Sequence, residues 1–443
     1  KFCYKLSLKI AIFRDSHKTY MRNHHITLKR NTDVSIIGKL KVFILFLLAL
    51  YSMQPYFFWG KSIVVAGLSA ILVLLTFCEY FTTNQYNDAI LSNQDIISFS
   101  TLIFFFLWNC VFFYGLFNPK TGSHSVIGSF FTTLIPITVF IFQSQNEKSY
   151  FLIFITNAMS LICAISFFFF LLFLLKIPLP NHKIYHPSSQ FYNYFDNYIF
   201  FILTRFGVLA VLPRFQSVFT EPGHLGMMCA LLLFANEYKL KKIQNIILLI
   251  SLIFSLSLAA YVLLFIGFFL YRFIMSKQKV CFVTSAVFVI SLLFLGGISF
   301  YKTFPESVFT QRILARLVFD EDKGIAGNNR NTKQFEKAFT KLEEDKVKLF
   351  LGTAVTGTTV GAEFPKGGNS SYKTYIFDYG LLGIILLLVF YLSFVRGGRK
   401  KLMIGMLLLW SASFLQRPYA TWLAQIFTYI GFCSNKDGEL KST

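Results

Sequence analysis

Long apolar runs recur along the chain between residues 40 and 433, separated by short polar connections and by two long polar stretches. The runs are continuous rather than alternating, which is typical of membrane-spanning helices and not of the strands of an outer-membrane barrel. The pattern predicts an all-α, polytopic transmembrane helix bundle of about twelve spans. The predicted spans lie near 40–59, 62–81, 96–117, 125–142, 150–175, 223–236, 242–256, 257–273, 279–299, 375–395, 402–416 and 418–433.

The two long polar stretches divide the predicted spans into three groups. The chain begins with Lys rather than Met, which makes Met21 a candidate for the native start and residues 1–20 a candidate non-native stretch. The predicted parts in chain order are a basic arm over 1–38, spans one to five within 39–175, a first loop over 176–222, spans six to nine within 223–299, a second loop over 300–374, spans ten to twelve within 375–433, and a tail over 434–443.

The distribution of charge predicts which side each connection faces. The chain is 55% hydrophobic and only 14% charged, yet it carries a net charge of +21. Much of that excess lies in three short connections, "NEYKLKK" (236–242), "YRFIMSKQK" (271–279) and "RGGRKK" (396–401). Lys and Arg accumulate in cytoplasmic loops, so these connections and the basic arm are expected in the cytoplasm. Both long loops then face the opposite, periplasmic side, and the positive charge gives no reason to expect nucleic-acid binding.

The stretch 242–273 permits two readings. It could form one long tilted helix, or a hairpin that turns at Ser255–Ser257. Basic connections at both of its ends favour the hairpin, because a single crossing would leave one of them outside. The spans show no internal repeat and few charged residues, which argues against an ion-coupled transporter.

The end of the first loop, "PRFQSVFTEPGHLG" (213–226), places an Arg, a Glu and a His directly before an apolar run. Pro222 suits the first turn of a helix and Glu221 suits its cap, so these two residues have a purely structural reading. Arg214 has a weaker one, because a Glu seven residues away could orient it. His224 could equally face a ligand or pack inside the bundle.

The second loop contains an amphipathic pattern and a small polar segment. The pattern "RNTKQFEKAFTKLEEDKVK" (330–348) predicts a helix with Phe335, Phe339 and Leu342 on one side. The segment "GGNSSYKT" (367–374) leads into the next span and could approach a ligand closely. Arg214 and Arg330, expected on the same face of the membrane, suggest an anion site, because guanidinium groups bind phosphate oxygens and remain charged.

These features together resemble the bacterial O-antigen and capsular polysaccharide polymerases (Wzy type), which share a superfamily with the O-antigen ligases. The resemblance rests on the R-F-x-x-x-F-x-E-P-G-x-x-G pattern from Arg214 and on "NSSYKTYIFDYGLLG" (369–383), and it covers roughly residues 200–395. It implies a multi-pass glycosyltransferase of the bacterial inner membrane that needs neither metal nor cofactor. Its donor and acceptor would be undecaprenyl-pyrophosphate-linked oligosaccharides, and a chain-length regulator would be a further partner.

The resemblance also implies roles for individual residues. Arg214 and Arg330 would stabilise the departing pyrophosphate, and Glu221 would orient Arg214 or accept the hydroxyl proton. The residues expected to bind substrate are Arg205, His224, Asn369, Ser370 and Tyr372. The ligases typically carry His-Asn where this chain has Gly368-Asn369, which favours a polymerase, although His224 or His186 could substitute. A ligase and a lipid-linked oligosaccharide flippase are the rival functions.

Overall fold

The structure is a computed structural model of the chain. It describes residues 34–82, 92–110, 122–186, 194–204, 212–307, 310–311, 313–317, 319–320, 324–325, 331–353, 357–361 and 369–435.

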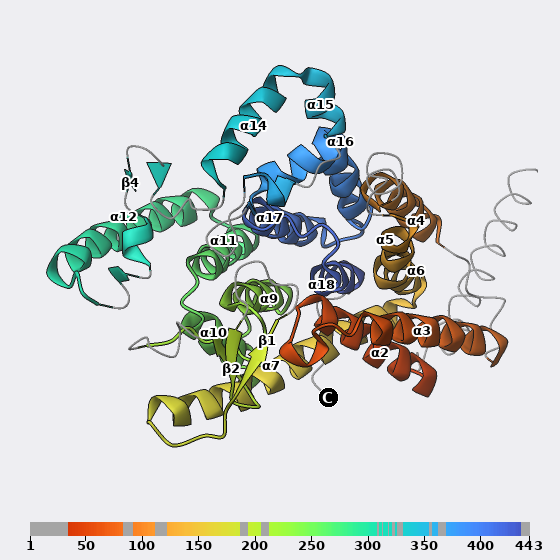
Figure 1. Ribbon diagram of the computed structural model, residues 1–443, viewed down its shortest axis with the longest axis horizontal. Helices are drawn as coiled ribbons and strands as arrows, with labels where there is room; N and C mark the ends of the chain where they lie inside the picture. The colour runs from red at the N-terminus through yellow and green to blue at the C-terminus, as the bar shows by residue number, and fades with distance from the viewer. Residues whose placement is uncertain are drawn as a thin grey trace, which may run out of the picture.

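Two short helices, α9 (Pro222–Ala235) and α18 (Leu423–Ser434), form the centre of a helical bundle (Figure 1). Every residue of both helices is buried, and the two helices contact each other. The helices packed directly against one or both of them are α2 (Ile36–Ser52), α6 (Ile135–Phe142), α7 (Gln145–Leu174), α10 (Ile243–Phe254), α11 (Leu258–Met275) and α17 (Lys400–Gln416). The other long elements, α3 (Ser62–Thr82), α4 (Asn93–Phe106), α5 (Gly122–Ser129), α12 (Lys279–Thr303) and α16 (Tyr372–Leu392), complete the bundle.

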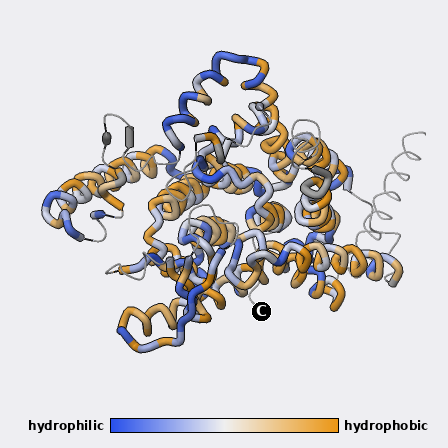
Figure 2. Tube along the Cα trace, viewed as in Figure 1, coloured by the Kyte–Doolittle hydropathy of each residue, from blue (hydrophilic) through white to orange (hydrophobic). Residues whose placement is uncertain are grey.

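The predicted helical class is confirmed, and several helices have the length and composition of membrane spans. Among the described residues, five helices are long and apolar enough to cross a membrane: α3, α7, α11, α12 and α16. Figure 2 shows the apolar character of the bundle and the polar character of α14 (Lys333–Glu344) at the top of the view. Several other predicted spans coincide with shorter apolar helices, including α9, α10 and α18.

Polar residues set where several of these helices begin. Ser35 and Ser92 cap α2 and α4 by accepting hydrogen bonds from backbone N–H groups of the first turn. Ser144 and Glu147 form a reciprocal capping box, in which each side chain accepts from the other's backbone N–H, at 3.2 and 3.0 Å. The capping box starts α7 five residues before the apolar run beginning at 150, so this helix is longer than predicted.

The helix break predicted at Ser255–Ser257 is present and separates α10 from α11. A Cβ placed on Gly226, near the start of α9, would overlap with Ala260 at the start of α11. A Cβ placed on Gly267 would meet the hydroxyl of Tyr238, just after the end of α9. Helices α9 and α11 are therefore parallel and in direct contact, and α10, which connects them along the chain, runs in the opposite direction and packs against α9.

The first long stretch contains strands, which the all-helical prediction missed. Strands β1 (His182–Tyr185), β2 (Tyr194–Asn197) and β3 (Ile202–Thr204) form an antiparallel sheet in the order β1-β2-β3. β2 and β3 contain the β-branched and aromatic residues that suit strands, and Phe195, Phe201 and Ile202 are buried. Some of the aromatic side chains of this stretch thus pack inside the protein.

The second long stretch contains the predicted amphipathic helix, divided into α14 (Lys333–Glu344) and α15 (Lys346–Leu351) at Asp345. Phe335, Phe339 and Leu342 are buried on one side, as predicted, and pack against Ile376 and Phe377 of α16. The remaining small elements are η1 (Tyr56–Phe58), the π-helical turn η3 (Phe130–Leu134), η4 (Leu314–Arg316), η5 (Gly357–Thr359), and the paired strands β4 (Phe319–Asp320) and β5 (Gly324–Ile325).

Ion pairs collect at one end of the bundle. Lys41 pairs with Glu79 and, at 2.9 Å, with Glu147. Further pairs at this end join Lys148 and Arg396 to Asp95 at 3.6 and 3.2 Å, and Arg399 to Glu237 at 2.6 Å. Every one of these residues belongs to a connection or helix end predicted to be cytoplasmic, so the positions that charge patterning assigned to one side do lie together.

Candidate functional site

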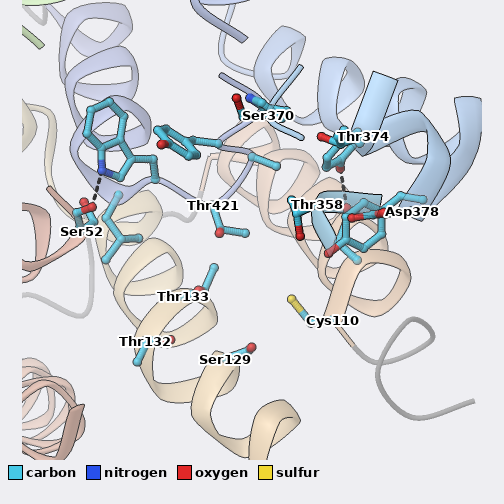
Figure 3. A pocket seen from close by; sticks show the side chains of 18 of the residues that line it. Ser52, Cys110, Ser129, Thr132, Thr133, Thr358, Ser370, Thr374, Asp378 and Thr421 are labelled. Atoms are coloured by element: carbon cyan, nitrogen blue, oxygen red, sulfur yellow. Dashed lines mark hydrogen bonds between the residues drawn. The ribbon is translucent and has the colours of Figure 1, made fainter. Parts of the chain in front are cut away.

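A cavity of about 470 Å³ lies at the opposite end of the bundle (Figure 3). Its walls come from segments far apart in the sequence: the ends of α2 and α4, the π-helical turn η3, the starts of α9 and α16, η5, and the loop 417–422 between α17 and α18. All these segments end on the side predicted to be periplasmic. The second long stretch contributes Thr358, Asn369 and Ser370 to the wall, whereas the described residues of the first long stretch do not line this cavity.

The cavity wall is rich in neutral hydrogen-bonding groups and aromatic rings. Its hydroxyl side chains include Ser52, Ser129, Thr132, Thr133, Thr358, Ser370 and Thr421, several of which point inward in Figure 3. Its aromatic side chains include Tyr51, Tyr375, Tyr379, Tyr419 and Trp422. Hydroxyls both donate and accept hydrogen bonds, and aromatic faces pack on apolar ring surfaces. This combination suits a ligand with many hydroxyl groups.

Glu221 and Pro222 occupy the helix-start positions that the sequence predicted. Pro222 is the first residue of α9 and Glu221 is its N-cap, but the Glu221 side chain makes no capping hydrogen bond. It forms an ion pair with Arg417 instead, and the two side chains are only 18% and 12% exposed. Gly223 makes this pair possible, because a Cβ there would lie 2.9 Å from Nη2 of Arg417.

The ion pair continues into a chain of polar contacts that reaches the cavity. Nη1 of Arg417 donates to the hydroxyl of Tyr419 at 3.0 Å, and that hydroxyl lies 2.9 Å from Nε2 of His224. His224 is 5% exposed and lines the cavity, so its side chain faces both a potential ligand and the bundle. The packing interpretation of His224 is confirmed, and its role in binding substrate stays a prediction.

Of the three predicted arginines, the structure describes only Arg214. Nε of Arg214 donates to the carbonyl oxygen of Ser255 at 3.2 Å, which fixes the side chain at the turn between α10 and α11. Arg214 lies at the same end of the bundle as the cavity but is not among its lining residues. Arg205 and Arg330 lie outside the described residues.

The three residues predicted in the second loop have different surroundings. The Asn369 side chain donates to the carbonyls of Gly357 and Val360 and accepts from the N–H of Thr332, all within 2.8 Å. Asn369 thus joins the starts of α14 and α16, and this accounts for most of its hydrogen-bonding capacity. Ser370 lines the cavity, whereas Tyr372 is 37% exposed and is not among the lining residues.

Arg417 and its neighbours were missed by the sequence analysis. The signal was present in "QRPYATW" (416–422), where an Arg stands between two apolar helices in a connection predicted to be periplasmic. Such a position runs against the cytoplasmic bias of basic residues. The predicted span 418–433 also starts too early, because α18 begins only at Leu423 and the loop before it supplies Tyr419 and Trp422 to the cavity.

A kink in α16 shapes another wall of the cavity. Gly380 has φ +71°, which interrupts the helix and exposes carbonyl groups of the preceding turn. The carbonyl of Phe377 accepts from N–H and Oγ1 of Thr353, both at 2.9 Å, and that of Tyr379 accepts from Nε1 of Trp108 at 2.9 Å. The kink therefore has its own hydrogen-bond partners, and it holds Asp378 at the cavity wall.

A smaller hollow of about 130 Å³ shares Tyr51, Ser52 and Gln54 with the cavity. Its other wall includes Trp59 and His186, whose ring centroids are 4.3 Å apart. Burial lowers the pKa of His186 below its usual value, which favours the neutral imidazole. The two hollows together offer aromatic surface on either side of the Tyr51–Gln54 segment.

Comparison with known proteins adds no further constraint. No protein-family model, curated protein or solved structure matches the chain. Within the described residues, no group of three or more His, Cys, Asp or Glu side chains could hold a metal ion. The functional argument therefore depends on the cavity and on the residues that form it.

Proposed function

We propose that the protein is a membrane glycosyltransferase that joins undecaprenyl-pyrophosphate-linked oligosaccharide repeats into a polysaccharide. The observation that carries the proposal is the cavity, whose hydroxyl and aromatic lining suits sugars. The Glu221–Arg417 ion pair is connected to its wall through Tyr419 and His224. The five long apolar helices support a location in a membrane. The residue pattern that resembles the Wzy-type polymerases begins at Arg214 and includes Glu221 and His224, two members of this series of contacts.

The sidedness of the bundle supports a periplasmic site in the bacterial inner membrane. Ion pairs join connections predicted to be cytoplasmic, and the cavity collects helix ends predicted to be periplasmic. A topology of about twelve spans with two long periplasmic loops accommodates both groups. Lipid-linked oligosaccharides presented on the periplasmic face would reach the cavity from that end.

In the proposed reaction, a hydroxyl oxygen of the acceptor sugar bonds to the anomeric carbon of the donor. The bond from that carbon to the pyrophosphate breaks, and undecaprenyl pyrophosphate leaves with the bonding electrons. Negative charge grows on the pyrophosphate as the bond breaks, and preorganised cations lower the barrier. Arg214 and Arg330 would supply the positive charge that stabilises the pyrophosphate, and Arg205 is a third candidate. A chain-length regulator protein would be a partner rather than part of the site.

An O-antigen ligase is the second candidate, and the observation that favours it is the position of His224. The ligases carry a His before the Asn that corresponds to Asn369, and this chain has Gly368 there. His224 lines the cavity and could take over such a role. A ligase would transfer a finished polymer to a different lipid, and would leave polymer formation intact when deleted.

The surface glycan of the source bacterium, resolved on a gel, tests the proposal. Deleting the gene should remove the long ladder and leave core carrying one repeat. The wild-type gene should restore the ladder and Arg214→Ala should not, whereas Arg272→Ala, at the other end of α11, should restore it. Loss of every repeat from the core would favour the ligase or a flippase. An unchanged ladder would contradict the proposal.

A further inference from the structure

Asp378 is the only acidic side chain among the described residues that line the cavity. It comes from α16, and it lies near Thr358 and Thr374 in Figure 3. The titratable groups lining the same region are Tyr375, on its own helix, and Cys110, beyond α4. No Lys or Arg of the described chain pairs with Asp378. This carboxyl group therefore faces neutral partners.

The position of Asp378 is fixed by several independent contacts. Its Oδ1 accepts a hydrogen bond from the N–H of Gly357 at 2.6 Å. The kink at Gly380 follows two residues later, and a Cβ at Gly352 would overlap with the carbonyl oxygen of Asp378. Among the described residues, Oδ2 has no hydrogen-bond partner. One oxygen is thus held by the backbone, while the other remains for a ligand.

We propose that Asp378 is the general base that accepts the proton of the acceptor hydroxyl, an inference that rests on the proposed function. As the acceptor oxygen bonds to the anomeric carbon, its proton passes to Oδ2 of Asp378. The carbon–oxygen bond to the pyrophosphate breaks in the same step, and the leaving group keeps the electron pair. Charge and atoms balance: the carboxylate becomes a carboxylic acid, and undecaprenyl pyrophosphate departs as an anion.

Two other groups able to accept a proton, His224 in the cavity wall and Glu221 next to it in the chain of contacts, are less suited to this role. The Glu221 carboxylate is engaged with the Arg417 guanidinium, which favours its charged form and opposes protonation. The His224 ring uses Nε2 to contact Tyr419, whose hydroxyl also accepts from the Arg417 cation. Asp378 combines a fixed position with a basic oxygen that no described cation neutralises.

Asp378→Asn isolates the base function from the structural one. The Asn Oδ1 can still accept the hydrogen bond from Gly357, but the amide cannot take up a proton. The assay uses the purified full chain in proteoliposomes, with lipid-linked repeat units isolated from cells that lack the gene. We expect polymerisation to slow by about 10²–10⁴-fold in the variant, the usual contribution of a general base. Glu306→Gln, an exposed acid outside the cavity, is the matched control and should keep the wild-type rate.

The pH profile provides a second readout that a structural role would not change. The wild-type rate should fall as the pH is lowered and the carboxylate takes up a proton, and this acidic limb should be absent from the residual activity of Asp378→Asn. Asp378→Glu should retain the limb at a reduced rate, which keeps the test usable if the Asn variant does not fold. A wild-type enzyme that polymerises while Asp378→Asn does so equally fast would overturn the role of Asp378 alone. No polymer from the wild type would overturn the proposed function, and this inference with it.

Discussion

The ion pair between Glu221 and Arg417 joins the start of α9 to the loop before α18, and its contribution to stability can be predicted. Both side chains are less than a fifth exposed, at 18% and 12%, so removing either partner leaves an unpaired charge with little access to water. Breaking such a pair costs about 3–5 kcal/mol of unfolding free energy. We expect Glu221→Gln and Arg417→Met each to fall in this range.

Two smaller effects each add to the cost of one of the single variants. The N-terminus of α9 favours a carboxylate and disfavours an unpaired cation by about 0.3–1 kcal/mol, which makes the loss of Glu221 more costly. The loss of Arg417 also removes its hydrogen bond to Tyr419, which adds about 1 kcal/mol to the cost of that variant. The two single variants should therefore agree within about 1 kcal/mol, while the double variant should cost no more than either of them.

Unfolding of the purified protein in mixed micelles, titrated with SDS, measures these differences. The pair between Glu336 and Lys373 is the matched control, because its side chains are 43% and 30% exposed. The same double-variant cycle there should give a coupling of about 1 kcal/mol or less. If the costs of Glu221→Gln and Arg417→Met simply add, the two residues do not act as a buried pair and the reasoning is wrong.

Three further predictions concern packing, ligand binding and topology. Gly226→Ala should cost about 1–3 kcal/mol in the same unfolding assay because its Cβ would overlap with Ala260, whereas Gly67→Ala in α3 meets nothing within 4 Å and should stabilise the protein by about 0.5–1 kcal/mol; equal effects would contradict the packing. Trp422→Ala should weaken binding of the isolated lipid-linked repeat, measured by fluorescence titration, about 10-fold or more through lost aromatic surface; unchanged affinity would exclude this wall from sugar binding. A cysteine replacing Lys348 should react with an impermeant maleimide in spheroplasts, and one replacing Lys241 only after lysis; the reverse order would contradict the topology.

Hydrophobic patterning predicted the helical class, and five of the described helices are long and apolar enough to cross a membrane. The break at Ser255–Ser257 was favoured by charge, since a single crossing would have left one of the two basic connections outside. The same parity argument assigned Glu237 and Arg399 to one side, and the structure brings their side chains to 2.6 Å. These features depend on composition and order along the chain, which the sequence contains directly.

The site itself was predictable only in part. Local rules located Glu221 and Pro222 at the start of α9, but the partner of Glu221 lies 196 positions away in the sequence, so no spacing rule connects it to Arg417. The role of Asn369 in joining two helix starts depends on three backbone groups of the second loop, which come together only in the fold. Asp378 was predicted to lie in an apolar span, because the sequence did not reveal the kink at Gly380. The carbonyls next to this kink accept hydrogen bonds from Thr353 and Trp108.

The strands of the first loop were missed for a different reason. β1 and β2 are four residues long and β3 only three, too short for an alternating pattern to stand out. Their pairing depends on register across a connection, which composition does not reveal. The burial of Phe195 and Phe201 shows that some aromatic residues of this stretch form a small core.

The central claim is that this cavity joins lipid-linked sugar repeats, and reconstitution tests it most directly. The purified protein in proteoliposomes would receive undecaprenyl-pyrophosphate-linked repeats isolated from cells lacking the gene, with no other enzyme present. The account predicts a ladder of products growing by one repeat at a time, with one undecaprenyl pyrophosphate released for each linkage formed. Repeats that remain single, under conditions in which the protein is folded and binds them, would contradict it.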